Sequence, residues 1–147
     1  MKSSRCPLLL LLLGVVSVWV GCSFKAERQG IPSEVEAAIG TVSDDIANEQ
    51  YEKIYNEASE LWRGAATLEQ SAEVFKKLKT KLGKVENRTL YSATEQNNSG
   101  GPLQGRAFIV TYQTKFERGE GMETFTLIQK DGKWLLARYF VNSTALN

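Results

Sequence analysis

The sequence predicts an α+β fold in which three N-terminal helices pack on a four-stranded antiparallel sheet. From Ile31 to about Gly83 the apolar residues recur with a helical period, and from Val85 to Val141 they alternate. The chain has 147 residues, so we expect one domain after an N-terminal targeting segment. We therefore divide it into a signal segment (1–21), a short tether (22–30) and a single α+β domain (31–147).

Residues 1–21 have the pattern of a signal peptide. Lys2 and Arg5 supply the positive charge, and residues 8–20 form an apolar run that is too short to span a bilayer. The run ends in Val20-Gly21-Cys22, which resembles a bacterial lipoprotein signal with Cys22 as the lipidated first mature residue. Cleavage after Ser23 and an uncleaved signal anchor remain as alternatives.

A lipid on Cys22 predicts a protein of the bacterial cell envelope, anchored to a membrane and facing the periplasm or the exterior. An extended tether over residues 23–30 reaches at most about 27 Å, so the domain is expected close to that membrane. Ser23 stands where an Asp would retain a lipoprotein at the inner membrane, which favours the outer membrane.

Three helices are expected in the first half of the domain. Ser33 and Glu36 form a capping-box pattern that opens the first, and Thr67 and Gln70 form another that opens the third. The third helix should end at Gly83, in a left-handed conformation. Between them, a stripe of apolar residues predicts a second helix that Gly64 ends. This stripe consists of Tyr51, Ile54, Tyr55, Ala58, Leu61 and Trp62.

Four strands are expected in the second half, over residues 85–94, 106–116, 122–130 and 133–142, with a polar loop over residues 96–102. Asp131-Gly132 predicts a type I′ hairpin turn, because both positions require positive φ. This turn sets a register that pairs Lys130 with Lys133, Ile128 with Leu135, Thr124 with Tyr139 and Glu123 with Phe140.

In that register one aromatic-rich face of the sheet also carries Glu123 and Arg138, on adjacent strands. Their diagonal spacing is about 7–8 Å, within reach of long side chains. An unpaired buried charge would cost several kcal/mol, so the two should meet each other or a ligand. They are interpreted either as a structural ion pair or as the polar floor of a small-molecule pocket that includes Tyr112. The expected apolar members of the face are Phe108, Val110, Tyr112, Phe116, Phe125, Leu127, Trp134, Leu136 and Phe140.

Composition excludes several classes of function. The 18 basic residues nearly balance the 17 acidic ones, which argues against a nucleic-acid binder. With no His and two Cys, the sequence predicts no metal site, and no motif indicates a cofactor or a set of catalytic residues. A basic cluster of Lys76, Lys77, Lys79, Lys81 and Lys84 is interpreted as a solvated helix face or as a contact for anionic lipid headgroups.

The stretch from about Asn48 to Val141 resembles a family of unknown function found in exported bacterial proteins. The residues that carry the resemblance are Asn48-Glu49-Gln50-Tyr51, Leu82-Gly83, Arg88-Thr89-Leu90, Glu123–Leu127, Asp131–Trp134 and Ala137–Phe140. Arg138 departs from the small residue expected at its position. The resemblance implies a nuclear-transport-factor-2-like fold, a cone of helices on a curved sheet. It implies no chemistry, since relatives of that fold include both enzymes and binding modules.

Two functions are therefore expected from different classes. The favoured one is a non-catalytic envelope lipoprotein that binds a partner protein or a small ligand, or helps to assemble an envelope complex. The alternative is a small-molecule isomerase or hydrolase, with Glu123 as base and a phenol from Tyr112, Tyr51 or Tyr55 as donor.

Overall fold

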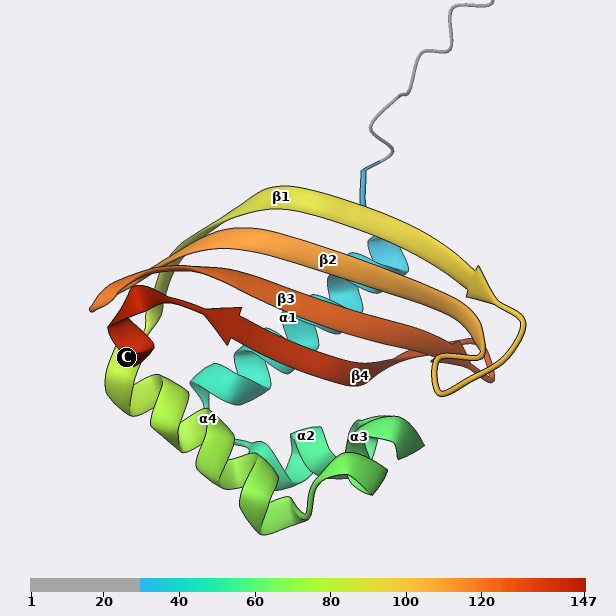
Figure 1. The fold of residues 1–147 in the computed structure, drawn as a ribbon, viewed down its shortest axis with the longest axis horizontal. Coiled ribbons are helices and arrows are strands. Elements are labelled where there is room, and N and C mark those ends of the chain that lie inside the picture. The colour runs from blue at the N-terminus through green and yellow to red at the C-terminus, as the bar shows by residue number, and fades with distance from the viewer. Residues whose placement is uncertain (1–29) are drawn as a thin grey trace, which may run out of the picture.

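The computed structural model describes residues 30–147 and has the expected α+β architecture, with the helices preceding the strands (Figure 1). The signal segment, Cys22 and most of the tether lie outside the described residues. The helices are α1 (Ser33–Ala47), α2 (Tyr51–Glu57), α3 (Glu60–Ala65) and α4 (Leu68–Leu82), and the 3-10 helix η1 (Thr144–Leu146) closes the chain. No helix over residues 30–147 is long and apolar enough to cross a membrane.

The strands form one antiparallel meander in the order β1-β2-β3-β4. They are β1 (Val85–Asn98), β2 (Gly105–Phe116), β3 (Gly119–Lys130) and β4 (Lys133–Asn142). Figure 1 shows the sheet as one layer and the helices as a second layer on one of its faces. Along each strand, successive side chains therefore alternate between the face that the helices cover and the uncovered face.

The two predicted capping boxes have different outcomes. At α4 the prediction is confirmed: the Thr67 side chain accepts a hydrogen bond from the Gln70 N–H, and the Gln70 side chain accepts one from the Thr67 N–H. At α1 it is wrong, because the helix already includes Ser33 and begins after Pro32, with no side-chain cap. The Pro32 carbonyl accepts from the Glu36 N–H, so the first turn closes one residue earlier than the motif suggests.

The predicted second helix is divided into α2 and α3. Ala58 is extended at the end of α2, and Ser59 caps α3 by accepting a hydrogen bond from the Trp62 N–H. The Ser59 N–H donates to the carbonyl of Leu136 on β4 at 2.9 Å. This contact holds the break between the two short helices against the edge of the sheet.

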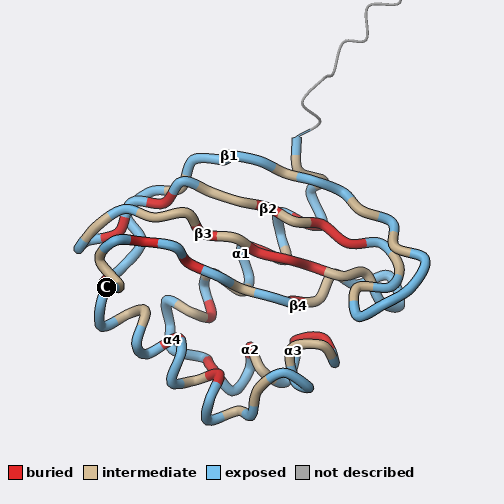
Figure 2. Tube along the Cα trace, in the orientation of Figure 1, coloured by how far each residue is buried: buried red, intermediate tan, exposed pale blue. Residues whose placement is uncertain are grey.

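The core lies between the two layers, as the buried segments in Figure 2 show. Phe75 on α4 is its centre: its ring stacks with those of Tyr51 and Trp62 and tilts against that of Tyr139, at centroid distances of 5.7, 5.8 and 5.6 Å. The remaining buried members are Val35, Ile39, Ile54, Ala58, Phe108, Val110, Phe125, Leu127 and Leu136.

The β3–β4 hairpin confirms half of the predicted register. Asp131 and Gly132 have φ of 51° and 76°, as a type I′ turn requires, and the pairs Lys130–Lys133 and Ile128–Leu135 form. Beyond them, Leu127 pairs with Leu136 but Thr126 pairs with Arg138, so Ala137 is an extra residue in β4. Such a bulge moves every later side chain to the opposite face.

β1 continues through the residues predicted as a polar loop and ends at Asn98. It is an edge strand with hydrogen-bonded neighbours on one side, so its polar side chains reach solvent. The connection to β2 is shortened to residues 99–104. A strand does not need apolar alternation when neither its edge nor its outer face is covered.

Candidate functional site

A fully buried carboxylate lies at the centre of the sheet face that the helices cover. Glu123 on β3 has 0% of its surface exposed. Its Oε2 accepts hydrogen bonds from Arg88 Nε at 2.6 Å and from Thr114 Oγ1 at 2.9 Å. Its Oε1 accepts from Arg88 Nη2 at 2.9 Å and from the Tyr139 hydroxyl at 2.7 Å. We call these four residues the Glu123 cluster.

Each strand supplies one member of the Glu123 cluster. Arg88 on β1 pairs with Thr114 on β2, and Glu123 lies opposite Tyr112, two residues before Thr114 along β2. On the other side Glu123 pairs with Val141, so Tyr139 on β4 is its diagonal neighbour. Diagonal neighbours are within reach of long side chains, and the four residues form a polar row across the sheet.

Within the Glu123 cluster, the negative charge of Glu123 is compensated by the positive charge of Arg88. Burial acts to lower the pKa of Arg88, but the hydrogen bonds and charge of Glu123 outweigh it, and the pKa is raised. The guanidinium also lies over the Phe125 ring, with its Cζ 5.7 Å from the centroid. Burial, and then the charge of Glu123, raises the pKa of Tyr139 well above 10, so its phenol donates at neutral pH.

The four hydrogen bonds fill the acceptor positions of the Glu123 carboxylate, which has about four lone-pair sites. A general base needs an oxygen that faces the substrate proton. Both oxygens of Glu123 instead face donors of the chain. The geometry therefore favours a structural role for this carboxylate over the predicted role as a base.

The predicted partnership of Glu123 with Arg138 is wrong. The bulge at Ala137 places Arg138 opposite Thr126 on the uncovered face, where its side chain is exposed. The same shift replaces the predicted pairs of Glu123 and Thr124: they oppose Val141 and Phe140. Phe140, expected in the core, is 63% exposed, and Tyr139 takes the inward position beside Glu123.

Tyr112 is on the predicted face, but its ring packs against Phe125 and it is not a member of the Glu123 cluster. It packs edge-on against Phe125 at a centroid distance of 6.1 Å and makes no hydrogen bond with Glu123 among the described residues. Burial raises its pKa. The phenol that does reach the carboxylate belongs to Tyr139. Of the other candidates, the Tyr55 hydroxyl donates to the Arg63 carbonyl at 3.4 Å, and Tyr51 stacks on Phe75 with a buried hydroxyl that has no hydrogen-bond partner.

Arg88, Thr114 and Tyr139 are the site residues that the sequence analysis missed, Tyr139 because of the bulge at Ala137. The available signal was Arg88 itself, an arginine inside an extended segment on the same face as Leu90. Whether this arginine reaches Glu123, two strands away, depends on the register between β1 and β2. The end of β1, which the sequence predicts as a polar loop, and the irregularity between Leu90 and Ser92 conceal that register.

A cavity of about 480 Å³ opens beside Arg88, between the C-terminal half of α1, α4 and the sheet. We call it the Arg88 cavity. Arg88 lines this cavity with a side chain that is 23% exposed, and its Nη1 makes no hydrogen bond among the described residues. The apolar lining consists of Ile46, Phe75, Leu78, Leu82, Val85, Phe116 and Val141. The cavity thus combines an apolar wall with the fixed guanidinium of Arg88, and Lys79, Lys84 and Asp44 also line it. Three cations against one carboxylate suit a small ligand with an anionic group.

Within residues 30–147 no group of His, Cys, Asp or Glu side chains is arranged to hold a metal ion. The fold and the site together define a small α+β domain, with helices on one face of an antiparallel meander and a buried carboxylate–guanidinium centre between the layers.

Residues 41–139 match the family described as Protein of unknown function (DUF4019). The match spans well over half of the chain, so the chain belongs to this family. No curated protein is found to match it in sequence.

Proposed function

We propose that the protein is a lipid-anchored lipoprotein of the bacterial cell envelope whose domain is a non-catalytic binding module. The Arg88 cavity carries this proposal, because it offers an apolar wall and a cation that is fixed in place by Glu123. An ion pair that fixes a guanidinium at the wall of a cavity is preorganised for an anionic group. Its occupant is a small amphipathic anion.

The alternative enzymatic function has less support. It requires Glu123 as a base, and this carboxylate is occupied by donors from Arg88, Thr114 and Tyr139. Proton transfer from a substrate would first have to break part of a buried ion pair, at a cost of several kcal/mol. The cavity beside the cluster needs no such rearrangement to bind a ligand.

We further propose that the domain has the cone shape of the nuclear-transport-factor-2-like fold. The four-stranded antiparallel meander with helices on one face supports this. In such a cone the ligand space lies between the helices and the sheet, which is where the Arg88 cavity opens.

The binding function is tested with 1-anilinonaphthalene-8-sulfonate, an apolar ring system with one anionic group. The full chain should bind it with a large rise in fluorescence. Ser43→Phe places a ring in the cavity from α1 and should abolish most of that rise. Gly40→Phe is the matched control on the same helix, at an exposed position where an added Cβ meets nothing within 4 Å. Equal fluorescence for both variants would contradict the proposal.

The anchor is tested separately by the intact mass of the protein purified from membranes. Cleavage before Cys22 together with added acyl chains should appear in the wild type and be lost in Cys22→Ala. An unmodified soluble chain would remove the anchor from the proposal and leave the ligand-binding function standing.

A further inference from the structure

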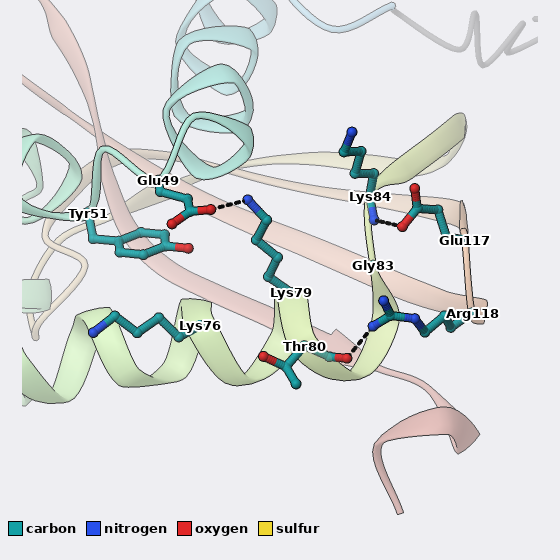
Figure 3. Close-up of a pocket in the computed structure, with 9 residues that line it drawn as sticks. All are labelled: Glu49, Tyr51, Lys76, Lys79, Thr80, Gly83, Lys84, Glu117 and Arg118. Carbon is teal, nitrogen blue, oxygen red and sulfur yellow. Dashed lines mark hydrogen bonds and ion pairs between the residues drawn. The ribbon is translucent and has the colours of Figure 1, made fainter.

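A second pocket, of about 500 Å³, lies at the C-terminal end of α4 and contains no member of the Glu123 cluster in its lining (Figure 3). We call it the Lys79 pocket. Three parts of the chain form it: the start of α2, the last two turns of α4 with the residues after it, and the β2–β3 turn. Its lining consists of Glu49, Tyr51, Lys76, Lys79, Thr80, Gly83, Lys84, Glu117 and Arg118.

The Tyr51 hydroxyl is an unpartnered polar group in this pocket. The residue is 7% exposed, and its hydroxyl is buried with no hydrogen-bond partner. Figure 3 shows it directed toward the Lys79 side chain, in the space between the Glu49–Lys79 pair and α4. A buried hydroxyl without a partner costs about 1–3 kcal/mol. A ligand atom that accepted its hydrogen bond would remove this cost.

The pocket has a surplus of positive charge. Lys76, Lys79, Lys84 and Arg118 line it with two carboxylates, so four cations face two anions. Glu117 does not pair with any of these cations through its Oε2, because that oxygen accepts a hydrogen bond from the Lys84 backbone N–H at 3.0 Å. Of the four cations, Lys79 and Lys76 are near enough to the Tyr51 hydroxyl for their charges to act to lower its pKa, against the larger effect of burial, which raises it.

The negative end of the α4 dipole is neutralised in the same place. Arg118 donates from its Nη1 to the Thr80 carbonyl and from its backbone N–H to the Leu82 carbonyl. The Gly83 N–H donates to the Lys79 carbonyl. These bonds occupy three of the last four carbonyls of α4, which would otherwise repel an anion.

The Glu49 carboxylate fills the anion position. It forms an ion pair with Lys79 above the Tyr51 ring, and its charge adds to burial in raising the pKa of Tyr51. Its side chain is largely exposed, so an exposed ion pair is all that holds it, and such pairs contribute at most about 1 kcal/mol. An external anion that also accepts from the Tyr51 hydroxyl has one hydrogen bond more than Glu49 has.

We propose that the Lys79 pocket binds a phosphate group, which displaces Glu49 from Lys79 and accepts a hydrogen bond from the Tyr51 hydroxyl. Lysines bind phosphate as point charges, whereas planar carboxylates are recognised by paired arginine donors. A phosphate monoester carries about −1.5 to −2 charge at neutral pH, which matches the surplus in the pocket. The phosphate comes from a lipid headgroup or from a free phosphate ester.

This site is distinct from the Arg88 cavity, although Lys79, Gly83 and Lys84 lie at the border of both. The Arg88 cavity is lined mainly by apolar side chains, and the Lys79 pocket by charged ones. Glu49 and Tyr51 line the Lys79 pocket and do not line the Arg88 cavity, so variants at these two residues distinguish a failure of one site from a failure of the other.

The test titrates the full chain, in a neutral detergent at pH 7.5, with inorganic phosphate and with dihexanoyl phosphatidic acid. Tyr51→Phe should weaken binding of both probes about tenfold, the effect of one hydrogen bond to a charged group. It should leave the free energy of unfolding without phosphate unchanged or higher, because it removes only an unpaired hydroxyl. Glu49→Gln should strengthen binding several-fold, because it removes the competing carboxylate.

Lys76→Gln with Lys84→Gln should also weaken binding. Lys77→Gln with Lys81→Gln is the matched control, since it removes the same charge from exposed positions that do not line the pocket. Tighter binding of the lipid than of inorganic phosphate supports a headgroup source, and equal binding supports a free phosphate. Absence of binding, unchanged affinity in Tyr51→Phe, or an equal loss in both lysine pairs would overturn the proposal.

Discussion

The Glu123 carboxylate is stabilised by its partners because none of its surface reaches water. Its two oxygens accept hydrogen bonds from a partly buried guanidinium, a hydroxyl and a phenol. Replacing a buried pair by apolar groups is often neutral, whereas removing one partner leaves the other charge buried and unpaired. The residue to change is therefore the carboxylate, with its shape retained.

Glu123→Gln should lower the free energy of unfolding by about 3 kcal/mol, since it leaves Arg88 without its counter-charge and places an amide N–H₂ against donors. Urea unfolding at pH 7 measures this. Glu95→Gln is the matched control, because Glu95 forms an ion pair with Arg106 in which both side chains are about half exposed. Its change should be below about 1 kcal/mol. Similar losses in the two variants would refute the structural role of Glu123.

Tyr139→Phe should reduce the loss of stability at alkaline pH. The pKa of Tyr139 is raised above 10 in the folded protein, so from about pH 10 upward the unfolded chain releases the phenolic proton and the native state retains it. The free energy of unfolding of the wild type should therefore fall as pH rises from 10 to 11.

In Tyr139→Phe this contribution disappears, and the decline between pH 9 and pH 11 should be shallower. Tyr91→Phe makes the same chemical change at an exposed position on β1 and should follow the wild-type curve. Parallel curves for the wild type and Tyr139→Phe would show that the phenol is not held as the structure indicates.

At the scale of elements, two capping-box motifs have different outcomes. Thr67-x-x-Gln70 forms a complete capping box, whereas Ser33-x-x-Glu36 forms none because α1 begins at Ser33 itself. Thr67→Ala should therefore lower the free energy of unfolding by about 1 kcal/mol, and Ser33→Ala should change it by less than about 0.5 kcal/mol. Chemical denaturation of the two single variants measures both values. Equal effects would mean that Ser33 caps α1 after all.

The elements could be predicted from sequence where a local signal was decisive. The type I′ turn at Asp131-Gly132 and the α4 boundaries follow from local chemistry, and both are confirmed. The bulge at Ala137 is not local: Leu136 and Ala137 are both buried, and a two-residue apolar step fits either register. A single extra residue then moved Arg138 out of the predicted site and Tyr139 into it.

The break between α2 and α3 has a tertiary cause as well. Apolar residues continue at helical spacing through Ala58, but the Ser59 N–H bonds to Leu136 on β4 and its side chain caps α3. Helical periodicity predicts which side chains face the core. It does not reveal a turn within the segment when the same side chains still face the core after that turn. Arg88 was missed for a related reason, since its position depends on a strand register set at a distance.

At the scale of the whole molecule, the two layers are joined by one aromatic contact network. Phe75 lies between Tyr51 and Trp62 on the helical side and Tyr139 on the sheet. Tyr139 in turn donates to Glu123, so the apolar core and the Glu123 cluster share one side chain. Phe75 also lines the Arg88 cavity, and Tyr51 also lines the Lys79 pocket. Both proposed sites therefore depend on how this ring is packed.

Phe75→Ala should lower the free energy of unfolding by about 3–5 kcal/mol, because it removes the transfer free energy of a buried ring and leaves a cavity between the layers. Val74→Ala is the control on the same turn of α4: Val74 is 50% exposed, so its truncation should cost less than about 1 kcal/mol. Phe75→Leu should retain about half of the lost stability, since it refills part of the space. A loss for Phe75→Ala no larger than that for Val74→Ala would mean that the helices and the sheet are held together by other contacts. Both sites would then be expected to bind their probes without this ring.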